Sequence, residues 1–247
     1  MPIRALIFDF DGLIVDTETP ALQSWQEIYA EYGVTLSVHD WAATLGANAG
    51  FDAHTHLVAL LRERDPLLAE RVIAEREAIL ARRQARKDAL SAHQSLLPGV
   101  ADLLAEARAA DLPCAVASSS SRRWVEGWLQ RLGVRHAFTT VVTADDVTAT
   151  KPAPDLFLAA AARLGLPPAE CLVLEDSPNG IRAARAAGCP VVAIPGAISG
   201  QVPLPPADLT LPSLAHTSLA ALQDWFASGE MVREPVDRVG RCTGQPS

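Results

Sequence analysis

Short hydrophobic runs recur along the chain, one near the N-terminus and four after residue 98, and each ends in polar residues. The runs are residues 5–8, Pro113–Ala117, Phe138–Val142, Cys171–Leu174 and Pro190–Ile194. Runs this short and continuous are typical of strands that are buried on both faces of a parallel sheet. The pattern therefore predicts a parallel sheet built from these five segments.

The segments between the later runs carry apolar residues at three- and four-residue spacing, which predicts helices. These segments are Val100–Ala110, Ser121–Leu132, Pro154–Leu164 and Pro178–Ala187. Alternation of strands and helices indicates an open α/β sheet wound with right-handed crossovers. We therefore expect an α/β fold with a Rossmann-like parallel sheet core.

The first strand is separated from the next by residues 9–112, far more than the roughly 30 residues of a βαβ unit. No glycine occurs between residues 51 and 98, and Asp65-Pro66 can begin a long helix that runs to about Leu90. We expect residues 17–95 to form an inserted all-helical cap domain. Residues 1–16 and 96–228 would form the core, and residues 229–247 an irregular tail.

Composition narrows the class of protein further. Hydrophobic residues make up 49% of the 247 residues, which excludes global disorder, and the net charge of −8 disfavours nucleic acid as a partner. The longest uncharged stretch, 189–207, contains five prolines, so we expect no membrane span. No CxxC pair occurs among the four cysteines. We expect reduced thiols and a cytoplasmic location.

Polar residues with useful chemistry follow four of the predicted strands. They are Asp9 and Asp11 after the first run, Ser118 and Ser119 after the second, Lys151 in the loop after the third, and Glu175 and Asp176 after the fourth. Ligands of open parallel sheets bind beyond the carboxyl ends of the strands. We therefore expect these side chains to gather at one edge of the sheet.

These residue types suit phosphoryl transfer with Mg²⁺, which prefers carboxylate oxygens, water and substrate phosphate as ligands. A hydroxyl and a lysine, such as Ser118 and Lys151, can hold phosphoryl oxygens. Two aspartates separated by one residue can divide the work, because one can attack phosphorus while the other handles a proton. Asp9 and Asp11 have that spacing.

The same residues resemble a known family. Asp9-Phe10-Asp11-Gly12, Ser118, Lys151-Pro152 and Glu175-Asp176 are similar to the four ordered motifs of the haloacid dehalogenase superfamily. The helical insert resembles the subgroup that contains β-phosphoglucomutase and many small-molecule phosphatases. The resemblance implies that Asp9 is the nucleophile and forms an aspartyl-phosphate, and that Asp11 is the general acid and base.

The resemblance also implies the remaining site residues. Mg²⁺ would be held by Asp9, the backbone carbonyl of Asp11, Glu175 and Asp176, although Glu175 could instead orient Lys151. The phosphoryl group would be bound by Ser118 and Lys151. Apart from the resemblance, Ser119 lies in the same loop, and its backbone N–H could also face the phosphate. The expected partner is a small phosphorylated metabolite, namely a sugar, polyol or glycolate phosphate, and the chain is expected to be a monomer or weak dimer.

Several alternatives stay open at this point. The mutases of this subgroup carry a histidine where this chain has Ala21. Hydrolysis of a phosphate monoester is therefore favoured over a hexose-phosphate mutase, although arginines near 82–86 could replace the basic pair of the mutase cap. A dehalogenase and a non-catalytic binding module are less favoured, because every residue type for phosphate chemistry is present.

The predicted cap carries 8 of the 21 Lys and Arg residues. They fit either a solvated helical face or a surface that attracts an anionic substrate. In the cap, Trp41 is a candidate for substrate contact. Trp124 lies at helix-like spacing in the core, and we expect it to be a packing residue.

Overall fold

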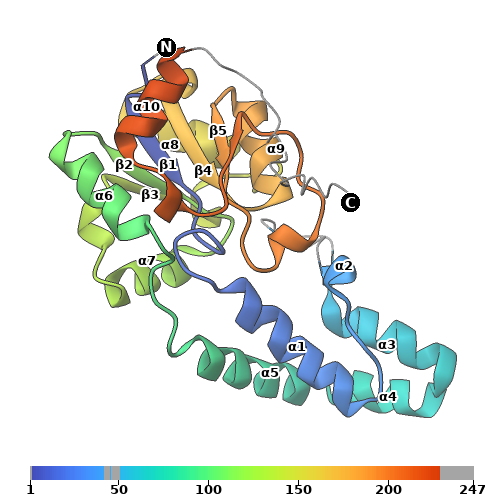
Figure 1. The fold of residues 1–247 in the computed structure, drawn as a ribbon. Coiled ribbons are helices and arrows are strands. Elements are labelled where there is room, and N and C mark those ends of the chain that lie inside the picture. Colours follow the sequence, from blue (N-terminus) through green and yellow to red (C-terminus); the bar gives the residue numbers. More distant parts are fainter. Residues whose placement is uncertain (1, 42–44, 46–50, 229–247) are drawn as a thin grey trace, which may run out of the picture.

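A computed structural model of the chain describes residues 2–41, 45 and 51–228. Its centre is one parallel sheet with strand order β3-β2-β1-β4-β5-β6 (Figure 1). The strands are β1 Ala5–Phe8, β2 Cys114–Ala117, β3 Thr140–Val142, β4 Cys171–Glu175, β5 Val191–Ala193 and β6 Leu209–Thr210. The first five correspond to the predicted runs. The edge strand β6 was not predicted.

Helices cover both faces of the sheet. Leu6 and Phe8 of β1 pack in one cluster with α6 Val100–Ala109, α7 Arg122–Arg131 and α10 Leu219–Ser228. Ala5 and Ile7 pack on the opposite face with α8 Asp155–Leu164 and α9 Pro178–Ala187. Short 3-10 helices lie at Arg135–Ala137, Ala144–Asp146, Pro168–Glu170, Ser199–Gln201 and Leu214–His216. The α/β fold class with an inserted helical part is confirmed.

The chain between β1 and α6 forms a separate group of helices, which we call the helical insert (Figure 1). Its helices are α1 Glu18–Glu31, α2 Val38–Trp41, α3 Ala53–Arg64, α4 Pro66–Ala74 and α5 Arg76–Ser91. They bury a hydrophobic cluster of their own, which includes Trp25, Tyr29, Leu57 and Ile79. The insert therefore has a hydrophobic cluster distinct from the two that flank the sheet, and Ile198, which follows β5, adds to it.

The single long helix predicted from Asp65 to about Leu90 is wrong. Asp65 does cap a helix, because its carboxylate accepts a hydrogen bond from the backbone N–H of Leu68 at 3.1 Å. That helix, α4, ends at Ala74, and α5 begins at Arg76 after Glu75. The break lets the two helices pack against different partners, because α4 packs with α3 and α5 lies along α1. Val72 of α4 and Ile79 of α5 are both fully buried in these contacts.

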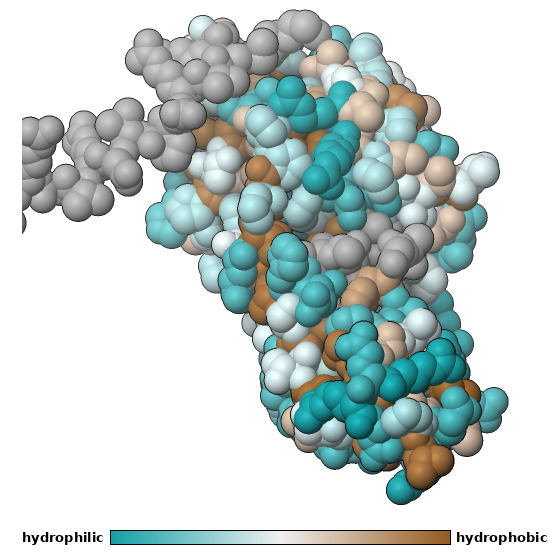
Figure 2. Space-filling model, turned by 90° about the vertical axis from the view of Figure 1, so that its right-hand side faces the viewer, coloured by the Kyte–Doolittle hydropathy of each residue, from teal (hydrophilic) through white to brown (hydrophobic). Residues whose placement is uncertain are grey.

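The face of the molecule in Figure 2 is largely hydrophilic, and its hydrophobic residues are scattered. Most arginines of the insert are exposed and pair with carboxylates, as Arg82 does with Glu31 and Arg86 with Glu27. Within the described ranges, no helix is both long and apolar enough to cross a membrane.

The three cysteines that the structure describes are buried and free of disulfide bonds. They are Cys114, Cys171 and Cys189. Burial raises the pKa of each thiol, to about 12 for Cys114 and Cys189 and about 11 for Cys171. They behave as packing residues. Cys242 and the predicted tail lie outside the described residues.

Candidate active site

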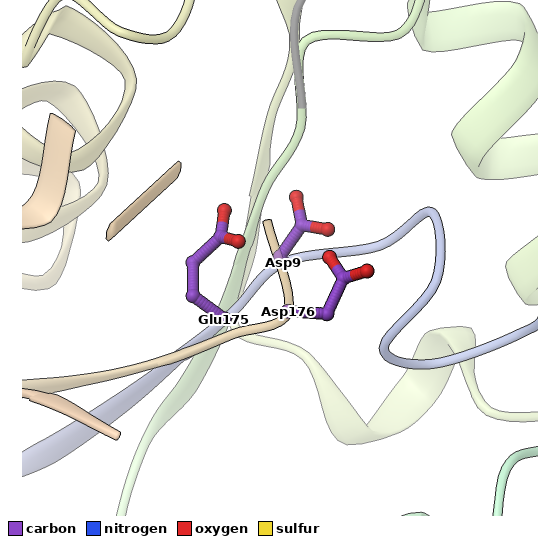
Figure 3. A group of neighbouring side chains, drawn as sticks. All are labelled: Asp9, Glu175 and Asp176. Carbon is purple, nitrogen blue, oxygen red and sulfur yellow. The ribbon is translucent and has the colours of Figure 1, made fainter. Parts of the chain in front are cut away.

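Three buried carboxyl groups meet at the C-terminal edge of the sheet (Figure 3). Asp9 follows β1, while Glu175 ends the neighbouring strand β4 and Asp176 comes next. The pairing of β1 with β4 sets Phe8 opposite Leu174, so the residues that follow these strands emerge side by side. Each of the three offers an oxygen within 4.8 Å of the others, and none is more than 4% exposed.

This crowding changes how Asp9 and Asp176 ionise. Burial, followed by the charge of Glu175, raises the pKa of Asp9 to about 8, although Lys151 opposes the shift. Burial and the neighbours Glu175 and Asp9 also raise the pKa of Asp176 well above its usual range. The three groups therefore repel one another, and a nearby positive charge would relieve that repulsion.

Lys151 supplies one such charge. The residue is 2% exposed, and its ammonium group donates hydrogen bonds to Asp9 and to Oε1 of Glu175, the latter at 2.6 Å. Burial alone would lower the pKa of Lys151, but the two carboxylates raise it above its ordinary value. Lys151 therefore stays charged at the centre of the site.

Glu175 is held from both sides. Its Oε1 accepts the bond from Lys151, and its Oε2 accepts from the backbone N–H and the hydroxyl of Ser177, at 2.9 and 3.0 Å. Gly180, in the first turn of α9, makes room for this carboxyl, because a Cβ there would lie 1.6 Å from Oε1. Glu175 is thus fixed against the lysine.

Asp176 is only partly satisfied by the protein. Its Oδ2 accepts a hydrogen bond from the hydroxyl of Ser199 at 3.0 Å. Its Oδ1 is buried and has no hydrogen-bond partner among the residues that the structure describes. Gly12, at φ +92°, lets the chain turn beside it, where a Cβ would lie 2.4 Å from Oδ2. A buried carboxylate oxygen without a donor, beside two further acids, fits a divalent cation.

Asp11 lies in a different setting, because four side chains donate to its carboxyl group. Thr17 and the indole of Trp124 donate to Oδ1 at 2.6 and 2.9 Å. Ser120 and Ser118 donate to Oδ2 at 2.6 and 3.4 Å. Trp124 was expected to be a packing residue, and it does pack against the core cluster, but the structure also gives it a polar contact with a candidate catalytic group. Sequence periodicity carries no signal for such a contact.

Asp9 and Asp11 open onto a pocket of about 370 Å³ between the sheet and the helical insert. The core also contributes the run Ser118–Ser121 and Trp124 to its lining. Lys151 and Asp176 do not line the pocket. The structure thus divides the predicted site residues into two groups. Lys151 and Asp176 are buried beneath the pocket, whereas Asp9, Asp11, Ser118 and Ser119 line it.

The helical insert supplies the opposite wall, with Glu18, Ala21, Trp41, Arg83 and Lys87. Burial, followed by Asp11, raises the pKa of Glu18 to about 7, and Lys87 opposes this shift. Burial and the neighbouring Arg83 lower the pKa of Lys87. Trp41 was a candidate from the sequence, and it does line the pocket. Arg83 and Lys87 are four residues apart on α5, and this spacing could have predicted from the sequence that they lie on the same face of the helix.

Comparison with known proteins gives the family. The model of a family described as haloacid dehalogenase-like hydrolase matches residues 3–188. The chain is 40% identical over 226 residues to YhcW of Bacillus subtilis, covering 92% of this chain and 99% of YhcW. It is 35% identical over 189 residues to the fructose-1-phosphate phosphatase YqaB of Escherichia coli, covering 76% and 94%.

A solved structure agrees with these relatives. A variant of CbbY from Rhodobacter sphaeroides, in complex with xylulose-(1,5)bisphosphate, matches with a TM-score of 0.66 and 30% identity, covering 90% of this chain and 99% of CbbY. The chain belongs to the haloacid dehalogenase-like hydrolases, as its motifs predicted. The relatives YhcW and YqaB are both named as phosphatases.

Proposed function

We propose that this enzyme is a Mg²⁺-dependent phosphatase that hydrolyses a small phosphate monoester through an aspartyl-phosphate on Asp9. The observation that carries this proposal is the buried set of Asp9, Lys151 and Asp176, of which Asp9 lines the pocket together with Asp11. The set combines a nucleophile, a cation and a candidate metal site within reach of one phosphoryl group.

Asp9, Asp176 and the backbone carbonyl of Asp11 would hold Mg²⁺, with Glu175 at the border of that site. The oxygen of Asp176 that lacks a hydrogen-bond donor among the described residues supports this assignment. Both oxygens of Glu175 already accept hydrogen bonds, so its main task is to fix Lys151. When bound, Mg²⁺ supplies positive charge that offsets both the acids and the phosphate.

In the first step an oxygen of Asp9 attacks phosphorus, a new P–O bond forms, and the bond from phosphorus to the ester oxygen breaks. Asp11 gives its proton to that leaving oxygen, so an alcohol departs. In the second step Asp11, now a carboxylate, takes a proton from water as the water attacks the aspartyl-phosphate. Inorganic phosphate leaves and Asp9 is restored. Lys151, Ser118 and the N–H of Ser119 would bind the phosphoryl oxygens.

The substrate class follows from the pocket and the relatives. A volume of about 370 Å³ lies at the small end of ligand pockets. YqaB is named as a phosphatase of a sugar phosphate, and the structure of the CbbY variant contains a bound sugar bisphosphate. A sugar, polyol or glycolate phosphate is therefore the proposed substrate. Ala21 lines the pocket where the mutases carry histidine, which supports hydrolysis over phosphate transfer between sugars.

The test is phosphate release from a panel of sugar, polyol and glycolate phosphates, with and without Mg²⁺. We expect release that requires Mg²⁺. We expect Asp9→Asn to lose both activity and the phosphorylated intermediate trapped by rapid acid quench, while circular dichroism stays unchanged. Substantial turnover by Asp9→Asn would contradict the nucleophile. A need for a sugar bisphosphate without net phosphate release would instead indicate a mutase.

A further inference from the structure

Trp124 lies between the candidate acid and the helical insert. It belongs to the first turn of α7, where Ser121 caps the helix by accepting a hydrogen bond from its backbone N–H at 3.4 Å. The indole N–H donates to Oδ1 of Asp11 at 2.9 Å. The side chain is half-buried and lines the pocket. One ring thus contacts the reacting group and forms part of the pocket wall.

The face of the same ring contacts the insert. The ammonium group of Lys87, on α5, lies 4.4 Å from the ring centroid, which is within the range of a cation–π interaction. Trp128, one turn further along α7, stacks edge-on against Trp124 at 5.8 Å, and Arg131 lies 4.7 Å over Trp128. Arg131 also donates to the carbonyl of Ala92, just after α5. Two contacts therefore join α7 to the end of the insert.

The indole differs chemically from the other groups around Asp11. The hydroxyls of Thr17, Ser118 and Ser120 can rotate and can donate or accept, whereas an indole N–H only donates. The indole beside Oδ1 cannot accept a proton from that oxygen, whereas the serine hydroxyls beside Oδ2 can rotate to accept one. The arrangement therefore favours Oδ2 as the oxygen that carries the transferable proton, while Trp124 holds Oδ1.

We propose that Trp124 is a positioning residue, whose N–H orients the carboxyl of Asp11 for proton transfer and whose ring is held in place by Lys87 from the helical insert. The orientation of the acid then depends on the insert being seated against α7. This inference rests on the proposed function, because it takes Asp11 as the group that protonates the leaving oxygen.

The test uses the leaving group. An alkyl phosphate needs a proton on its departing oxygen, whereas p-nitrophenolate leaves without one. We expect Trp124→Phe, which keeps a ring but removes the N–H, to lower kcat/KM for the alkyl phosphate by about tenfold and for p-nitrophenyl phosphate by less than about threefold. Asp11→Asn should give the same split between the two substrates, that is, a greater loss of kcat/KM for the alkyl phosphate, and the difference should be larger. Trp225→Phe, the same change on α10 and away from the pocket, should leave the ratio of the two kcat/KM values unchanged.

Lys87 is tested by a double-mutant cycle. We expect Lys87→Met to lower kcat/KM for the alkyl phosphate more than for p-nitrophenyl phosphate, but by a smaller factor than Trp124→Phe does. When Trp124 is already Phe, Lys87→Met should not change the ratio of the two kcat/KM values any further. Equal losses on both substrates, no loss at all, or fully additive effects would overturn the inference. An inactive wild-type enzyme, or an Asp11→Asn variant without the split, would contradict the proposed function instead. The two failures are therefore distinguishable.

Discussion

Gly180 illustrates how closely single residues fit around the acids. Its position in the first turn of α9 leaves no room for a side chain, since a Cβ would lie 1.6 Å from Oε1 of Glu175. We predict that Gly180→Ala displaces Glu175 and weakens its bond to Lys151. Overpacking of this kind costs about 1–3 kcal/mol, and activity should fall with the loss of the lysine's position. Urea denaturation and phosphate release would measure the two effects.

Gly127 provides the matched control, because it is also helical and a Cβ there would meet nothing within 4 Å. Alanine is the better helix former by about 1 kcal/mol. Gly127→Ala should therefore keep activity and leave the enzyme as stable or slightly more stable. Similar losses of stability and activity in both variants would show that the effect of Gly180→Ala does not come from its contact with Glu175.

At the scale of elements, α1 and α5 are joined by both buried and exposed contacts. Ile79 of α5 is fully buried in the insert's cluster, while Arg82 forms an ion pair with Glu31 in which both side chains are about half exposed. We predict that Ile79→Ala costs about 2–4 kcal/mol, since it leaves a cavity. Arg82→Ala should cost only a small fraction of that, because exposed ion pairs contribute little. Urea denaturation of the two variants tests the order, and equal effects would contradict it.

The elements also show what the sequence could predict. Buried strands such as Cys171–Glu175 were recognised because a continuous apolar run leaves few alternatives. The edge strand Leu209–Thr210 was missed because two residues, one of them exposed, have no detectable period. The break at Glu75 was missed because no proline or glycine marks it. It follows from long-range packing against α3 and α1.

At the scale of the whole molecule, the site joins residues from two parts of the chain. Asp9 and Asp176 could be predicted to meet, because parallel strands deliver their following residues to one edge. The contacts of Lys87 and Trp124 with the pocket could not be predicted. They depend on how the helical insert lies against α7, and local patterns along the chain do not encode that orientation.

The stability of the whole molecule should depend on pH through the acids of the site. The folded, metal-free protein raises the pKa of Asp9 from 3.8 to about 8, and that of Asp176 also lies well above its usual range. Between pH 4 and pH 8, roughly the two pKa values of Asp9, the folded state therefore binds more protons than the unfolded state. Stability therefore falls as pH rises from about 4 towards 8.

Mg²⁺ should reverse this trend, because its binding requires the carboxylates to lose their protons. We predict that saturation with Mg²⁺ raises the melting temperature more at pH 8 than at pH 6. In Asp9→Asn one of these acids is absent, so the metal-free protein should lose less stability between the two pH values. Thermal unfolding with EDTA or excess Mg²⁺ measures both. A metal-induced shift that is the same at both pH values would mean that the buried acids are not the ligands.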